Sequence, residues 1–179
     1  MAWYEYAAVF ITCLTALSLV YSTIRTGISP MPSSIAARKA LLTLSHDLNG
    51  PIYELGSGWG GLAAALSRAH PQQQVIGIEL SWLPWLYSTT IHKLVGPKNL
   101  EFKRGDFLNV DLSPAAAVVC YLHPKGMDNL AKKLTADAVT DVTIISNTFR
   151  LPGHEPVASM TMTDLYQTRI YRYEINSAP

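Results

Sequence analysis

A glycine-rich turn between a strand-like run and a helix-like run constrains the fold more than any other feature of the chain. The turn covers residues 56–61 (GSGWGG), follows the run 52–55 (IYEL) and precedes the run 62–66 (LAAAL). A strand, a glycine loop and a helix in this order form the first unit of a doubly wound α/β sheet, where a cofactor lies over the carboxyl end of the strand. Glycine suits such a loop because a Cβ atom would obstruct both the sharp turn and the close approach of a ligand. We therefore expect a Rossmann-like α/β fold with a cofactor site at this turn.

Glu54 separates two cofactors whose binding loops share this glycine spacing. The spacing satisfies the dinucleotide fingerprint, so it also admits a nicotinamide-dependent oxidoreductase. A carboxylate two residues before the first glycine, however, would lie near a pyrophosphate and repel it. The same carboxylate suits a cofactor that has no phosphates and a cationic amino-acid end. The sequence therefore favours S-adenosylmethionine, and it offers no arrangement for hydride transfer.

Acidic residues at two further strand ends support this choice. Glu79 ends the next predicted strand, 25 residues after Glu54, with Leu80 beside it. An acid at this position is placed to accept hydrogen bonds from both ribose hydroxyls. The third strand ends in Gly-Asp-Phe, where Asp106 would accept from the adenine amino group and Phe107 would stack on the ring.

In this order the three motifs resemble those of the class I S-adenosylmethionine-dependent methyltransferases, over about residues 30–175. The resemblance implies that Glu79 holds the ribose and that Asp106 and Phe107 hold the adenine. It also implies that five residues surround the methionine part of the cofactor. These are Glu54, Gly56, Ser57, Gly58 and Gly60.

Three other segments resemble the small membrane-anchored protein-lysine methyltransferases. They are residues 29–33 (SPMPS), 120–124 (CYLHP) and 147–153 (NTFRLPG). That family includes the mitochondrial enzymes acting on the adenine nucleotide translocase and on ATP synthase subunit c. The resemblance implies that the methyl acceptor is a lysine side chain of a membrane-associated protein.

The acceptor site is expected beyond the fourth and fifth strands, next to the cofactor. Many amine methyltransferases carry Asn- or Asp-Pro-Pro-aromatic after the fourth strand, whereas this chain has the segment 121–124 (YLHP), which favours a flexible lysine amine. Tyr121 is expected to line the pocket, and His123 is a candidate for the base that takes the proton of the lysine. Asn147, at the end of the fifth strand, is a further pocket candidate. The alternatives are that His123 caps the following helix and that Asn147 is a turn residue.

Residues 1–25 are predicted to be an N-terminal membrane anchor. No charged residue lies between Glu5 and Arg25, and the run 7–24 is mostly apolar. This length is close to the roughly 20 residues that cross a bilayer as a helix. Basic residues follow the run, so the positive-inside rule predicts a single-pass protein whose domain lies in the cytoplasm. A helix that docks on the domain is the alternative.

The second predicted domain, residues 26–179, alternates strands and helices, which indicates a parallel sheet with helices on both faces. The predicted elements are a helix 35–48 capped by Ser33 or Ser34, strands 51–55, 74–79, 100–103, 116–121 and 142–148, and helices 61–69, 83–94 and 125–134. Two alternating runs, 157–163 and 168–175, predict a final antiparallel pair. Only residues 150–155 separate this pair from the fifth strand, too few for a helix. We therefore expect the substrate side of the sheet to be sparsely covered.

Composition excludes several other classes of protein. A net charge of +1 over 179 residues shows no excess of the kind that nucleic-acid binding requires. Cys13 and Cys120 lie far apart, and the five histidines show no ligand spacing, so neither a disulfide nor a metal site is expected. Methylation of a small molecule or a lipid remains open, as does an inactive membrane-tethered binding module. The oligomeric state is not predicted.

Overall fold

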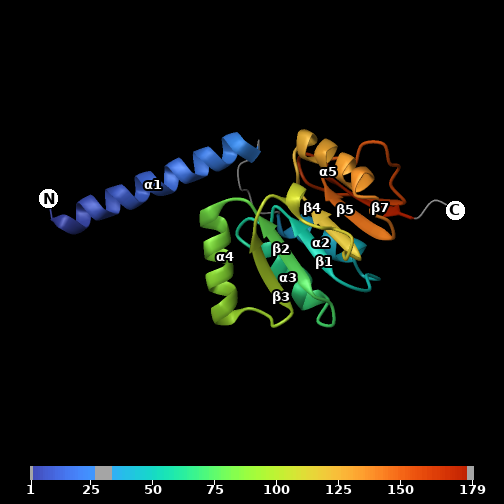
Figure 1. Ribbon diagram of the computed structural model, residues 1–179, viewed down its shortest axis with the longest axis horizontal. Coiled ribbons are helices and arrows are strands. Elements are labelled where there is room, and N and C mark those ends of the chain that lie inside the picture. The colour runs from blue at the N-terminus through green and yellow to red at the C-terminus, as the bar shows by residue number, and fades with distance from the viewer. Residues whose placement is uncertain (1, 27–33, 177–179) are drawn as a thin grey trace.

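A seven-stranded mixed sheet organises the protein, as the computed structural model shows for the described residues 2–26 and 34–176 (Figure 1). The strand order is β3-β2-β1-β4-β5-β7-β6. The strands are β1 (Ile52–Leu55), β2 (Val75–Glu79), β3 (Leu100–Arg104), β4 (Ala117–Cys120), β5 (Val142–Asn147), β6 (Ala158–Thr161) and β7 (Arg169–Ile175). The helices are α1 (Trp3–Thr26), α2 (Ile35–Leu44), α3 (Gly61–Ala69), α4 (Trp82–Val95) and α5 (Pro124–Ala136), with a short 3₁₀ helix η1 (Phe107–Asn109).

The first five strands are parallel, and β7 pairs antiparallel with both β5 and β6. This arrangement confirms the Rossmann-like sheet and its final antiparallel pair. The strand order reverses between the neighbouring strands β1 and β4, because the chain returns from β3 at the edge of the sheet to β4 beside β1. Ligands of open α/β sheets bind at such a point, outside the carboxyl ends of the strands.

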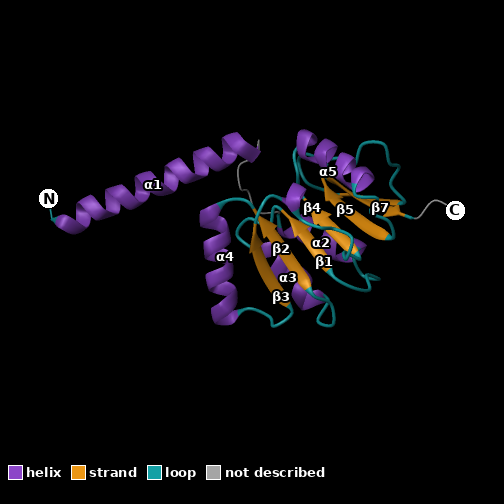
Figure 2. Cartoon of the chain, viewed as in Figure 1, coloured by secondary structure: helices purple, strands orange, loops and turns teal. Residues whose placement is uncertain are grey.

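Two apolar cores cover the two faces of the sheet. Helix α5 packs on one face, and α2 and α3 pack on the other (Figure 2). The sequence of α5 explains its position, because Pro124 starts the helix and Met127, Leu130 and Leu134 form one buried stripe. The central strands β1, β2 and β4 are buried along their whole length, as parallel strands covered on both faces must be.

The predicted helices are confirmed with small shifts of their ends. Ser34 caps α2, its hydroxyl accepting a hydrogen bond from the backbone N–H of Ala37 at 3.1 Å. This helix ends at Leu44 rather than at residue 48, because the Ser45 hydroxyl donates to the Leu42 carbonyl and contacts the ring of His70 instead. The other predicted capping residue, Ser33, lies outside the described residues.

The prediction of a transmembrane helix at residues 1–25 is not supported. The segment does form the long helix α1. Yet in the described part of the chain, no helix combines the length and the apolar character that crossing a bilayer requires.

Candidate functional site

The glycine loop lies at the carboxyl end of β1 and is tied to the end of β2. The backbone N–H groups of Gly56 and Ser57 both donate to the Ile78 carbonyl at 2.9 Å. Gly58 has a φ of 53°, which favours glycine, and no described atom lies within 4 Å of a Cβ built there. A ligand can therefore approach the loop at this position without meeting a side chain.

Glu54 lies on β1 beneath this loop and is only 5% exposed. The backbone N–H of Ala63 hydrogen-bonds to its carboxylate. Among the described residues, its Oε2 atom has no hydrogen-bond partner, and neither has the buried hydroxyl of Ser57. Burial raises the pKa of Glu54 well above its usual value, and repulsion from Glu79 adds to this. The buried carboxyl group of Glu54 is suited to a cationic group of a ligand, because such a group would supply the missing hydrogen-bond partner and favour the ionised form.

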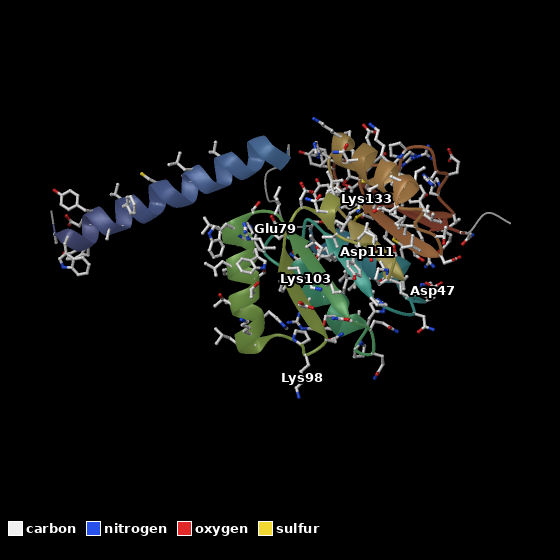
Figure 3. The ribbon with its side chains drawn as sticks, in the orientation of Figure 1. Asp47, Glu79, Lys98, Lys103, Asp111 and Lys133 are labelled. Atoms are coloured by element: carbon white, nitrogen blue, oxygen red, sulfur yellow. The ribbon has the colours of Figure 1, made fainter. Side chains whose placement is uncertain are left out.

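Glu79 joins the end of β2 to the glycine loop. Its Oε2 accepts from the N–H of Gly58 at 2.8 Å, and its Oε1 accepts from the N–H of Ser81 at 2.7 Å. Figure 3 shows Glu79 at the carboxyl end of β2, beside the start of α4. Each carboxylate oxygen has a second lone pair, so the group can also accept from a diol of a ligand. Leu80, half-buried, follows it directly.

Asp106 and Phe107 follow β3 and form the start of η1. Asp106 caps this 3₁₀ helix by accepting from the backbone N–H of Leu108 at 3.1 Å. Phe107 is half-buried and packs against the core beneath α5. Both residues thus have a structural role, and their contact with an adenine stays a prediction.

The residues predicted to bind the methyl acceptor lie at the carboxyl ends of β4 and β5. Tyr121 follows β4 and stacks on Phe149, with 6.5 Å between ring centroids and 14° between ring planes. His123 stands at the N-terminus of α5, where, within the residues described, its ring makes no capping hydrogen bond. Asn147 ends β5, is 3% exposed and accepts from the Thr148 hydroxyl at 3.2 Å.

The segment 121–123, which is predicted to line the site of the methyl acceptor, lies next to the glycine loop through Leu122. A Cβ built on Gly56 would lie 3.8 Å from the Leu122 Cδ2 atom. The site therefore places the glycine loop and the segment 121–123 side by side, as predicted from their positions at neighbouring strand ends. Cys120, just before it, is buried, and burial raises the pKa of its thiol to about 12, so a thiolate nucleophile is absent at this residue.

Two residues of the site were not predicted from the sequence. Phe149 completes the aromatic pair with Tyr121, and Arg38 on α2 approaches the glycine loop. The charge of Arg38 offsets a small part of the rise that burial causes in the pKa of Glu54, and its guanidinium lies 3.3 Å from a Cβ built on Gly61. The missing side chain of Gly61 thus leaves room for the Arg38 side chain, a signal that only the folded structure reveals. Over residues 2–26 and 34–176, no group of three or more metal-ligating side chains is present.

Comparison with known families and structures gives one family match and many structural matches. The chain matches the family described as ANTKMT methyltransferase domain over residues 54–158. No curated protein matches it. Among solved structures, an RNA methyltransferase from Salinibacter ruber in complex with S-adenosyl-L-homocysteine has a TM-score of 0.71 at 24% identity, covering 83% of this chain and 96% of that one.

Two further structures are similar at lower identity. Precorrin-6y C5,15-methyltransferase from Geobacter metallireducens has a TM-score of 0.60 at 12% identity, covering 82% of this chain and 90% of that one. The M1A22 tRNA methyltransferase TrmK of B. subtilis has a TM-score of 0.60 at 15% identity, covering 77% of this chain and 66% of that one. At these identities the structures establish the fold that the sheet order already indicates.

Proposed function

This chain belongs to the ANTKMT methyltransferase domain family and is an S-adenosylmethionine-dependent methyltransferase, and we propose that it methylates a lysine side chain of a membrane-associated protein. The family match over residues 54–158 includes the glycine loop, Glu79 and the segment 121–123. That match, together with the segment 121–124 (YLHP) at the end of β4, carries the proposal.

The residues around the glycine loop fit the cofactor. Glu54 offers an unpartnered buried oxygen for the ammonium group of its amino-acid end, and Glu79 offers acceptors for the ribose. The open backbone at Gly58 admits close approach. When bound, S-adenosylmethionine supplies a methyl group on a cationic sulfur that leaves as a neutral thioether.

The acceptor side supplies groups suited to an amine. A lysine side chain is protonated at neutral pH and must lose a proton before its nitrogen can attack. In this proposal the imidazole of His123, which makes no capping hydrogen bond to α5, takes that proton. Tyr121 and Phe149 present aromatic surface at the same strand ends, where an alkyl chain or a cation binds favourably. The main contribution of the protein is to hold the amine and the methyl group in line.

A membrane-associated substrate is favoured by the resemblance to membrane-anchored lysine methyltransferases and by the side chains of α1. Trp3, Tyr4, Tyr6 and Phe10 are each at least 61% exposed on that helix. Aromatic side chains of this kind are enriched at membrane–water interfaces.

Labelled-methyl transfer tests this proposal. The full chain is incubated with isolated membranes, with the soluble fraction of the same cells and with cofactor carrying a deuterated methyl group. We expect the label on lysine in one or a few membrane proteins, identified by peptide mass spectrometry. Label on lipid, on RNA or on small molecules, with none on lysine, would contradict the proposed acceptor and leave the methyltransferase activity intact.

A further inference from the structure

Helix α4 has an apolar face that the rest of the described chain leaves exposed. Its inner side packs on the edge of the sheet through Pro84, Ser88 and Trp85, whose indole N–H donates to the Phe102 carbonyl at 3.3 Å. The outer side is formed by large apolar side chains that are 42% to 76% exposed. This α4 face consists of Trp82, Leu86, Tyr87, Ile91, Leu94 and Val95.

The α4 face continues onto the cofactor loop. Trp59, between Gly58 and Gly60, meets Tyr87 edge-on, with 5.3 Å between ring centroids and 81° between ring planes. A shallow groove between them is lined by side chains that are almost entirely apolar, among them Leu83 and Ile91. A contiguous exposed apolar surface of this kind marks a site of interaction with a protein, a membrane or a ligand.

The charges around the α4 face are positive. The sequence has no acidic residue from 80 to 100, but it has Lys93 and Lys98, both exposed. At the other end of the helix, the Arg104 guanidinium lies 6.0 Å from the centroid of a Trp82 ring. Lys98 lies past the C-terminal end of α4, whereas Glu79 lies near the start of this helix and is buried (Figure 3). The exposed acid on neighbouring β3, Glu101, pairs with Lys103 at 3.8 Å.

An apolar helix face with aromatic residues, on a helix that carries a lysine and no acidic residue, has the chemistry of a helix that lies in the plane of an anionic membrane surface. A protein interface core fits less well, because lysine is depleted there. Helix α1, with its exposed aromatic residues, contacts α4 and extends from the domain on the same side (Figure 1). The strands β7 and β6 lie at the opposite edge of the sheet.

We propose that the α4 face binds the headgroup region of an anionic phospholipid bilayer, with Trp82, Tyr87 and Leu94 toward the lipid and with Lys93 and Lys98 at the phosphates. This binding orients the β3 edge of the sheet toward the membrane. The inference rests on the membrane location within the proposed function, but it is tested without methyl transfer, so failure of one is distinguishable from failure of the other.

A site-specific fluorescent label tests the contact in the full chain. Cys13 is exposed and is replaced by serine, whereas Cys120 is buried and is kept. A polarity-sensitive dye is attached to Leu94→Cys or, as the matched control, to Leu165→Cys, which is 90% exposed between β6 and β7. Cofactor titration of each labelled protein confirms that it is folded. Vesicles contain phosphatidylcholine alone or a mixture with phosphatidylserine.

We expect the emission at position 94 to shift to the blue, and to resist an aqueous quencher, with the anionic vesicles, while position 165 does not change. Lys93→Gln should weaken vesicle binding about fivefold, the effect of one charge near an anionic surface, and Lys132→Gln on α5 should have little effect. An unchanged emission at position 94 on protein that sediments with the vesicles would overturn the proposal. So would a vesicle-independent shift that grows with protein concentration, because a second copy would then cover the face.

Discussion

Replacing Glu54 by glutamine is expected to weaken cofactor binding and to stabilise the protein without cofactor. The carboxylate is 5% exposed, and among the described atoms its Oε2 has no partner. A hydrogen bond to a charged group contributes about 1.5–3 kcal/mol, so loss of the carboxylate should raise the Kd for S-adenosylmethionine roughly 10- to 100-fold. Glutamine keeps an acceptor for the Ala63 N–H but removes the cost of a buried charge. The free energy of unfolding without cofactor should therefore stay the same or rise by about 1 kcal/mol at pH 8.

The burial of Glu54 also predicts how the stability and the cofactor affinity of the wild type change with pH. Because burial raises the pKa of Glu54, the folded protein without cofactor retains this proton more readily than the unfolded chain does. Its stability should therefore fall as the pH rises above the ordinary carboxyl range, and this fall should be smaller in Glu54→Gln. A bound ammonium favours the ionised carboxylate, so the affinity of the wild type for S-adenosylmethionine should rise over the same pH interval.

Calorimetric titration and thermal unfolding at several pH values measure both effects. Glu101→Gln is the matched control, since this carboxylate lies on the neighbouring strand β3 but is about half exposed. The control should bind cofactor like the wild type at every pH. If Glu54→Gln also binds like the wild type, or if it loses several kcal/mol of stability, the assignment of Glu54 to the ammonium group is wrong.

Three further substitutions test other parts of the account. His123→Asn should lower kcat about 100-fold and leave the Kd of the cofactor unchanged; an unchanged kcat would exclude the ring as the base. Gly77→Ala should lower the free energy of unfolding in urea by about 1–3 kcal/mol, because the added Cβ would lie 2.7 Å from a phenylalanine ring on β3. Gly105→Ala is its control and should unfold like the wild type, because no described atom lies within 4 Å of a Cβ built there. Equal urea midpoints for the two alanine variants would contradict this packing argument. Tyr173→Phe should lower the free energy of unfolding by about 1–3 kcal/mol, because the Tyr173 hydroxyl accepts from the buried N–H of Leu151 at 3.0 Å. Hydrogen exchange of the Leu151 amide should become faster in this variant. An unchanged stability would show that another group accepts the hydrogen bond of that amide.

Much of the fold could be predicted from the sequence because its signals are local. The helix 61–69 is confirmed at both ends, since the glycine loop fixes its start and the strand that follows fixes its length. The end of α2 was predicted four residues too late, because contacts of Ser45 with Leu42 and His70 decide it. The 3₁₀ helix after β3 was not predicted, since three residues carry no periodic pattern.

The positions of site residues could be predicted where an acidic residue lies at or near a strand end. The structure places Glu54 and Glu79 at the glycine loop, and their contacts with the cofactor stay predictions. The stacking of Tyr121 on Phe149 and the approach of Arg38 to the glycine loop were missed. Both depend on segments that are distant in the sequence and come together only through the sheet order.

The central claim is that the glycine loop binds S-adenosylmethionine rather than a dinucleotide. Calorimetric titration of the full chain with S-adenosylmethionine, S-adenosylhomocysteine and NADH tests it directly. The account predicts that the first two bind at one site, that Glu79→Ala weakens both and that NADH does not bind. Binding of NADH alone by the folded protein would contradict the account.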